Sequence, residues 1–477
     1  MPGREASTFH KRAARYVKVS GAAAAAGARA IAGGFAGDGE QCRRRRAEIL
    51  RKVLGDLKGP VMKIGQFLAV IPDLLPEEYA AELARTQTGA PPMGHAFVRR
   101  RMAAELGPGW REKFRSFEMD AAFAASLGQV HRAVGLDGTL LACKLQYPDM
   151  ASAVEADIRQ IGLALSLFSA IGGSIDTAQA KAELADRLRE ELDYSREAKH
   201  IALYRQMFGL EGKGRAPRAG GKGKGGRRKL PAPPLAVTEE DWLVHIPGVI
   251  EKLSTNRLLT MTWLGGEKLA DVCEAGPQEL RDSVAANIFR AWYMPFFRYG
   301  VIHGDPHPGN YTIRPGGGVN LMDFGCVRVF SPRLVEGVVR LYEALRGGDE
   351  ALAAEAYRAW GFDNPCKRLI KTLNIWAGFV YAPFLRDRTM TIAETNTGVY
   401  GRETALRVYR ELRGIGGISI PREFVLIDRA SIGLGSVFLR LGAKLNWHRL
   451  FNCLICGFDA KEVGERQKKA LKEAGLD

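Results

Sequence analysis

One short stretch of the sequence, residues 301–328 (VIHGDPHPGNYTIRPGGGVNLMDFGCVR), constrains the function of the chain more than any other. It contains His303, Asp305, Asn310 and Asp323. An Asp can orient or deprotonate an attacking oxygen, while an Asn five residues later and an Asp on the next strand can hold Mg²⁺ on phosphates. The spacing therefore predicts the metal and nucleophile end of a phosphoryl-transfer site.

The length and composition of the chain predict a folded protein with an anionic partner. A chain of 477 residues can bury a substantial core and forms about two to three structural units. Its 46% apolar and 26% charged residues exclude wholesale disorder, and a mean hydropathy of -0.14 argues against a multispanning membrane protein. The net charge of +16 implies nucleotide phosphates, anionic lipid or nucleic acid as a partner. Charge alone does not choose among them.

The cysteines predict a reduced compartment, because they are scattered along the chain and no secretory apolar segment precedes them. Two of them, Cys453 and Cys456, form a CxxC inside an apolar run (LFNCLICGF). No second pair completes a tetrahedral zinc site. We therefore expect buried thiols on a helix.

The N-terminal residues 1–35 are basic and rich in Ala and Gly, with Glu5 as their only acid. Two interpretations stay open. A transit peptide would place the protein in the mitochondrion. A mobile leader or an amphipathic surface segment would suit a cytoplasmic protein that lies peripherally on a membrane. The longest strongly apolar run, residues 161–175, falls short of the roughly 20 residues that a spanning helix needs, so we expect a buried helix there.

Residues 41–110 predict a helical extension ahead of the first strands. Within the apolar run VMKIGQFLAV, Lys63 and Gln66 lie three residues apart and so share one helix face. That face is either a solvent-facing stripe or a face turned toward an acidic or phosphate-bearing site. The periodicity does not decide between the two.

Residues 115–148 predict strands and tight turns, including an LDGT hairpin. The order is a strand, a small-residue loop, a strand, a turn and a third strand with Lys144 near its end. This is the layout of the nucleotide-clamping half of a protein-kinase-like domain. Lys144 then takes the place that meets the α and β phosphates. The loop is unusual, because only Gly128 stands where kinases have several glycines for close approach of the backbone to phosphate.

Residues 183–205 predict one long charged helix. Asp193 and Glu197 lie one turn apart on one face, whereas Glu191 projects well round the helix from Glu197. A single helix could therefore serve two lysines. A solvated face is the ordinary meaning of such a charged run.

The rest of the chain contains one segment of unusual composition, followed by predicted strands and helices. Residues 209–234 are rich in Gly, Lys, Arg and Pro and predict a disordered basic insertion, which could contact nucleic acid or anionic lipid or simply keep the chain soluble. Strand-like runs follow at 243–250 and 257–264, where Met261 lies at the position of a kinase hinge. We expect a buried helix at 282–299, a loop at 308–310, short strands at 311–313 and 319–322, and a mostly helical scaffold at 331–477.

Six motifs together resemble the UbiB/ADCK family of atypical, protein-kinase-like kinases. They are KIGQ (63–66), AASLGQVHRA (124–133), ACKLQYP (142–148), ELDYSREA (191–198), HGDPHPGN (303–310) and DFG (323–325). The resemblance implies an α+β, protein-kinase-like two-lobed fold with a helical N-terminal extension and a mostly helical C-terminal region. The expected domains are a leader at 1–40, the extension at 41–110, an N-lobe at 111–264 and a C-lobe at 265–477.

Carried over residue by residue, the resemblance also implies roles for side chains. Lys144 is expected to pair with Glu197, and Asp305 is expected to be the catalytic-loop Asp. Asn310 and Asp323 are expected to be metal ligands. The expected regulatory residues are Lys63, Gln66, Glu191 and Asp193, and the expected nucleotide contacts are Ala124, Ala125, Ser126, Gly128, Gln129, Lys144 and Met261.

The resemblance implies an ATPase or a small-molecule or lipid kinase of ubiquinone biosynthesis that uses ATP or ADP with Mg²⁺. Anionic lipid, isoprenoid-quinone intermediates and a quinone-biosynthesis protein complex are the implied partners, and nucleic acid is not expected. A helix that carries Lys63 and Gln66 would occupy the cleft that a peptide substrate needs. Phe123 stands where many members have Ala, which leaves the choice between ATP and ADP open.

Two alternatives to this function stay open. One is a small-molecule phosphotransferase of the aminoglycoside- or choline-kinase type, which also uses HGD and a following Asn. The DFG tripeptide and the KIGQ helix weigh against it. The other is a pseudokinase that binds nucleotide only to remodel a partner complex.

Overall fold

The computed structural model describes residues 93–210, 243–362, 365–395 and 421–477. Within the first of these ranges, residues 126, 156–157, 160–184 and 187 are not described. Residues 404, 407–408, 410–412 and 415 are described as well. The described residues belong to two compact units, each considered by itself. The first comprises those within Met1–Arg99, Met119–Val130 and Lys144–Leu192, and the second those within Arg100–Glu118, His131–Cys143 and Asp193–Asp477. Several predictions lie outside the described residues: Lys63, Gln66, Ser126, the leader, the helix at 161–175 and most of the insertion at 209–234.

Four strands form the predicted sheet of the kinase-like N-lobe. They are β1 (Phe114–Ala125), β2 (Gly128–Gly135), β3 (Leu140–Gln146) and β5 (Leu258–Thr262), in the order β1-β2-β3-β5. The LDGT hairpin joins β2 to β3, and the Asp137 carboxylate accepts hydrogen bonds from the N–H and hydroxyl of Thr139 at 3.0 and 2.8 Å. Gly138 has a φ of +86°, which glycine adopts without steric cost. The predicted strands and hairpin turn within residues 115–148 are confirmed, whereas the predicted Ala-rich loop (124–129) is shorter, because β1 runs to Ala125 and β2 begins at Gly128.

The predicted helix at 183–205 is wrong in its continuity. Glu191 and Leu192 form a turn, Asp193 is the N-cap, and helix α8 (Tyr194–Met207) starts after it. The Asp193 carboxylate accepts a hydrogen bond from the N–H of Arg196 at 3.0 Å. The short Asp side chain satisfies an N–H group that has no partner within the helix, so it favours a fresh start at this position.

Two small sheets carry the 301–328 stretch. Strand β7 (Val301–His303) pairs antiparallel with β10 (Val327–Val329). Strands β8 (Tyr311–Ile313) and β9 (Val319–Leu321) form a hairpin in a second sheet, with the order β4-β9-β8-β6. The two predicted strands here are confirmed, whereas the predicted loop at 308–310 is a single 3₁₀ turn, η4 (Pro308–Asn310), which proline favours at its first position.

The remaining strands of this second sheet are very short. Strand β4 covers Val244–His245 and β6 covers Glu267–Lys268. The strand-like run at 243–250 was therefore predicted too long. Pro247 follows β4 and has no N–H to donate to a strand partner, which accounts for the early end.

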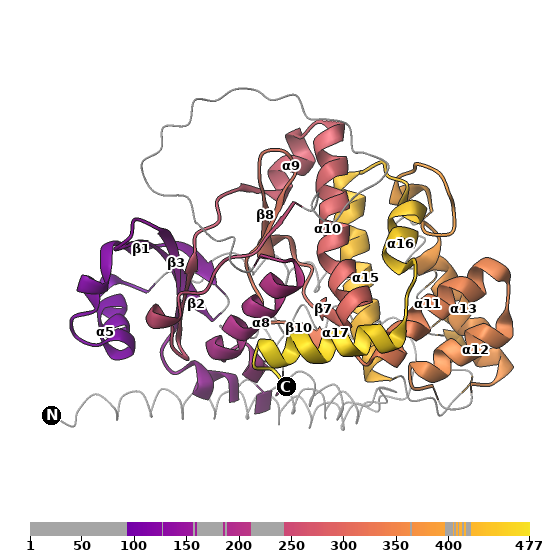
Figure 1. The fold of residues 1–477 in the computed structure, drawn as a ribbon, viewed down its shortest axis with the longest axis horizontal. Helices are drawn as coiled ribbons and strands as arrows, with labels where there is room; N and C mark the ends of the chain where they lie inside the picture. The colour runs from indigo at the N-terminus through magenta and orange to yellow at the C-terminus, as the bar shows by residue number, and fades with distance from the viewer. Residues whose placement is uncertain are drawn as a thin grey trace, which may run out of the picture. The chain divides into compact units, whose positions relative to one another are not determined.

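The buried helix predicted at 282–299 is confirmed as helix α10 (Gln278–Tyr299), which contacts α15, α16 and α17 (Figure 1). Its buried side chains include Phe289, Trp292, Phe296 and Phe297.

The prediction that the region after residue 331 is mostly helical is confirmed. Its helices are α11 (Pro332–Gly347), α12 (Glu350–Ala359), α13 (Lys367–Tyr381), α15 (Arg422–Leu441), α16 (Trp447–Ile455) and α17 (Ala460–Glu473), and the other elements of the fold are α5 (His95–Leu106), η1 (Trp110–Lys113), η3 (Glu251–Leu253), α9 (Leu269–Ala275) and η5 (Ile392–Glu394).

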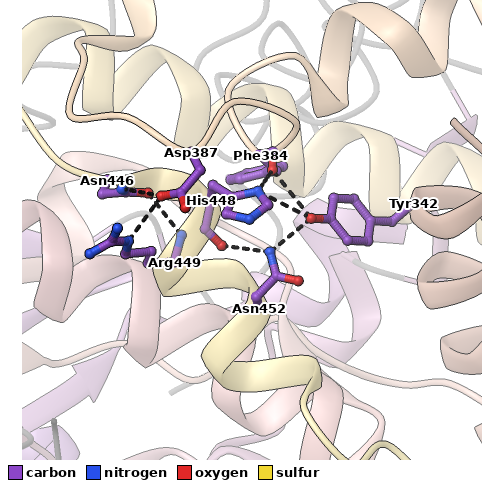
Figure 2. Close-up of polar contacts among 7 residues, drawn as sticks. All are labelled: Tyr342, Phe384, Asp387, Asn446, His448, Arg449 and Asn452. Carbon is purple, nitrogen blue, oxygen red and sulfur yellow. Dashed lines mark hydrogen bonds and ion pairs between the residues drawn. The ribbon is translucent and has the colours of Figure 1, made fainter. Parts of the chain in front are cut away.

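A polar network ties α16 to α11 and to the segment that follows α13 (Figure 2). The His448 Nδ1–H donates to the Phe384 carbonyl at 2.7 Å, and the Asn452 amide donates to the Tyr342 hydroxyl at 2.7 Å. Tyr342 is buried, so its hydroxyl needs such a partner. Nearby, the exposed Asp387 accepts from Asn446 at 2.8 Å. The network therefore fixes the helices of this region to one another.

The prediction that Cys453 and Cys456 are buried is wrong, because both are exposed. Helix α16 buries the face that carries Trp447 and Phe451. Cys453 follows Phe451 by two residues, which turns it about 200° away from that face. No helix in the described part of the chain combines the length and apolar character needed to cross a membrane.

We predict that Gly300→Ala lowers the free energy of unfolding more than Gly348→Ala does. Both glycines end a helix in the left-handed region, with φ of +64° and +68°, where alanine costs about 1–2 kcal/mol. At Gly300 a Cβ would also meet the Phe330 carbonyl oxygen at 2.7 Å and overlap the Gln467 side chain, whereas nothing lies within 4 Å at Gly348. Overpacking adds about 1–3 kcal/mol. Urea unfolding of the two variants measures the difference, and equal losses would contradict the prediction.

Candidate active site

The pairing of β7 with β10 brings the two halves of the 301–328 stretch together. His303 lies opposite Val327, and the Gly304 N–H donates to the Cys326 carbonyl at 2.7 Å. A Cβ on residue 304 would lie 2.8 Å from the Cys326 sulfur, so only glycine fits here without displacement of the thiol. The segment before Asp305 is thus held directly against the segment after Asp323.

His303 joins these two segments through its side chain. Its imidazole is buried, and its Nε2–H donates to the Asp323 carbonyl at 2.6 Å. A carbonyl oxygen can only accept, so Nε2 carries the proton and Nδ1 is free to accept from the Asp305 N–H at 3.2 Å. The indole N–H of Trp292 holds the His303 carbonyl at 2.9 Å. Both ring nitrogens of His303 are therefore used to position the backbone at the two aspartates.

Asp305 and Asn310 contact each other directly. The Asn310 amide N–H₂ donates to the Asp305 carboxylate at 3.0 Å and to its backbone carbonyl at 3.1 Å. The amide nitrogen is therefore committed to Asp305, which leaves the Asn310 side-chain oxygen as the group that can coordinate a cation. The contact between these two side chains closes the loop, and their roles in phosphoryl transfer stay predictions.

Asp323 follows β9 and is brought beside Asn310 by the β8–β9 hairpin. Tyr311 pairs with Leu321, and the Met322 N–H donates to the Asn310 carbonyl at 2.9 Å. One oxygen of the Asp323 carboxylate accepts from the Gly325 N–H at 2.9 Å. A carboxylate and an amide oxygen suit Mg²⁺, which binds through one or two carboxylates and takes the rest of its ligands from phosphates and water. Over the described ranges, no three His, Cys, Asp or Glu side chains converge on a metal site of their own.

Helix α8 holds the DFG segment from the other side. The N–H of Phe324 lies 3.4 Å from the Glu197 carboxylate, and the His200 Nδ1–H donates to the Phe324 carbonyl at 2.9 Å. Burial lowers the pKa of His200 to about 4, so its imidazole is neutral at pH 7. The Tyr204 ring packs edge-on against Phe324, with centroids 5.1 Å apart. Three side chains on one face of α8 thus fix one buried residue of the site.

The C-terminal helices also contact the site, which the sequence did not indicate. Gly433 on α15 faces Pro306, and a Cβ at residue 433 would overlap the proline ring. On α17, the Gln467 amide donates to the carbonyls of Tyr299 and Phe330, both at 2.8 Å, at the start of β7 and just beyond β10. These contacts hold the loop that follows β7 and the β7–β10 pair in place.

The structure places the remaining predicted residues as follows. Lys144 lies on β3 and is half-buried, while Met261 is buried on β5. Gln129 is fully buried and accepts a hydrogen bond from the Met93 N–H at 2.8 Å, so much of its amide is used inside the first unit. Ala124 and Ala125 end β1, Gly128 begins β2, Glu191 lies in the turn before α8, and Asp193 is exposed at its N-cap. Their roles toward nucleotide, and the Lys144–Glu197 pair, stay predictions.

The chain is similar to several curated kinases. The probable serine/threonine-protein kinase abkA of Dictyostelium discoideum is 29% identical over 304 residues, which are 62% of this chain and 50% of that protein. The mitochondrial atypical kinase COQ8B of Rattus norvegicus is 26% identical over 305 residues, 64% and 52% of the two chains. The chloroplastic ACTIVITY OF BC1 COMPLEX KINASE 1 of Arabidopsis thaliana is 30% identical over 308 residues, 62% and 40% of the two. This chain therefore spans about half or less of the length of these relatives.

A solved structure and a protein family match the fold. The structure of Rv3197 from Mycobacterium tuberculosis in complex with erythromycin has a TM-score of 0.57 and 24% identity, and the match covers 88% of this chain and 97% of that one. At this identity the likeness concerns the fold alone. The ABC1 atypical kinase-like domain matches residues 85–219 and 236–357, which contain every motif of the site from Ala124 to Asp323. The chain belongs to the UbiB/ADCK family of atypical kinases.

Proposed function

We propose that this protein binds ATP with Mg²⁺ and either hydrolyses it or transfers its terminal phosphoryl group to a small molecule or lipid of isoprenoid-quinone metabolism. The observation that carries the proposal is the junction at His303, which brings Asp305 and Asp323 onto adjoining segments. Membership of a kinase-like family and the mitochondrial and chloroplastic kinases among the relatives support it. A location in an organelle or on a membrane surface is part of this proposal.

The side chains of the site suit this chemistry. Asp305, held by Asn310, would orient the attacking hydroxyl or water and take its proton. The Asn310 and Asp323 oxygens would hold Mg²⁺, which supplies neutralising charge at the phosphates when it is bound. Lys144 would meet the same phosphates and be oriented by Glu197. The residues of the Ala-rich loop from Ala124 to Gln129, together with Met261, would contact the nucleotide, as ATP or ADP.

A substrate other than protein follows from the predicted place of Lys63 and Gln66. A helix that carries them over the cleft, with Glu191 and Asp193 as its acidic partners, would exclude a peptide. A soluble phosphate acceptor would favour the aminoglycoside- or choline-kinase type. Stabilisation by Mg-nucleotide without turnover would favour a pseudokinase that acts on a partner complex. An ATPase assay with and without anionic liposomes and a quinone head-group analogue separates these functions, because stimulation is expected only for the lipid-linked one.

We predict that Asp323→Asn lowers Mg²⁺-dependent ATP hydrolysis by at least about 100-fold, because it removes a charge that stabilises the transition state. The change keeps the shape of the side chain and an oxygen for the Gly325 N–H. Asp387→Asn is the matched control, since it makes the same change at an exposed Asp in the helical C-terminal region, where its partners are Asn446 and Arg449. Unchanged hydrolysis by folded Asp323→Asn would refute the assignment, and thermal unfolding establishes that both variants are folded.

We predict that Gly433→Ala lowers the kcat of ATP hydrolysis, whereas Gly435→Ala does not. Both glycines lie inside α15, where alanine favours the helix by about 1 kcal/mol. A Cβ at residue 433 would displace Pro306 and with it the catalytic loop, while nothing lies within 4 Å of a Cβ at residue 435. A misplaced catalytic group costs rate more than stability. Equal kcat values for the two variants would show that the contact with Pro306 does not position the loop.

A further inference from the structure

A cavity lies among α10, α11, α13 and α15. The volume that the centre of a water-sized sphere can reach inside it is about 60 Å³. By the same measure one water needs roughly 10–15 Å³. No polar side chain of the candidate active site is among its described lining residues. Its walls are mostly aliphatic and aromatic, and the aromatic residues include Tyr293, Trp360, Trp376, Tyr381, Phe384 and Phe424.

Asp428, on α15, is the only carboxyl group among the described residues that line this cavity. It is half-buried, and the indole N–H of Trp376 on α13 donates to one of its oxygens at 2.5 Å. Burial raises the pKa of Asp428 to about 7, against the opposing effect of that hydrogen bond. Within the described part of the chain, no cationic side chain pairs with it. The ionised form of a carboxyl group in such surroundings costs free energy unless a positive charge lies beside it.

We propose that this cavity binds a small organic ammonium ion, with the charged nitrogen on Asp428 and the apolar part against the aromatic walls. The carboxylate supplies the counter-charge, and the apolar part of the ligand packs against the aromatic side chains that line the cavity. Mg²⁺ or Ca²⁺ does not fit as the ligand, because each needs about six or more oxygen ligands and the described lining residues offer few. The volume suits a primary alkylammonium with a chain of about four non-hydrogen atoms. The proposal is independent of the phosphoryl-transfer function.

The test compares n-butylammonium with 1-butanol, which has the same length without the charge. The full-length protein is titrated at pH 8, and binding is followed by the NMR signal of the Trp376 indole N–H, assigned with a Trp376→Phe sample. Because this N–H contacts Asp428, a ligand at the carboxylate shifts its signal. We expect saturable binding, with butylammonium at least about tenfold tighter than butanol.

Asp428→Asn is the informative variant, since it removes the charge and keeps an oxygen for the Trp376 N–H. We expect it to lose the preference for the ammonium ion, while the control Asp387→Asn, whose carboxylate bonds to Asn446 outside the cavity, keeps it. The absence of saturable binding, an equal affinity for butanol, or an unchanged preference in Asp428→Asn would each overturn the proposal. The comparison of the two ligands in the unaltered protein decides the matter even if Asp428→Asn does not fold.

Discussion

The candidate active site depends on the buried imidazole of His303. Its two nitrogens join the Asp323 carbonyl to the Asp305 N–H, across a β7–β10 pair of only three residues each. Two strands of this length offer few backbone hydrogen bonds, so the side-chain bridge fixes the relative position of both aspartates. Loss of either bond would leave a polar group unpaired in a buried place, which costs about 1–3 kcal/mol. The neutral tautomer, with its proton on Nε2, is the only one that satisfies both partners.

The bridge is in turn supported from three directions. Helix α8 holds both backbone groups of Phe324 through Glu197 and His200, and α15 packs Gly433 against Pro306. Helix α17 joins the start of β7 to the end of β10 through Gln467. The last two helices lie beyond residue 357, where the match to the ABC1 domain ends. The C-terminal region is therefore a scaffold that directly supports the site, through contacts that the sequence did not indicate.

The sequence predicted the elements and the polar residues of the site, because both depend on local spacing. The LDGT turn and the short strands at 311–313 and 319–322 follow from neighbouring residues and are confirmed, whereas the roles of HGDPHPGN and DFG stay predictions. The contacts that hold them were not predictable, since Gly433 and Gln467 are separated by more than 100 residues from Pro306 and Phe330. The break before α8 did have a local signal, namely Asp193 as a capping residue. The exposure of Cys453 depends on which face of α16 is buried. The sequence does not show which face this is, because apolar residues occur on every side of the helix.

Helix α15 meets different constraints on its two sides. Asp428 and Gly433 are five residues apart, which places them about 140° apart round the helix. On the side of Gly433 the proline ring leaves no room for a methyl group, whereas on the side of Asp428 the helix borders a cavity. A close-packed interface transmits displacement and a cavity absorbs it. The close contact with Pro306 ties α15 to the loop on one side, and the hydrogen bond from Trp376 to Asp428 ties it to α13 on the side of the cavity.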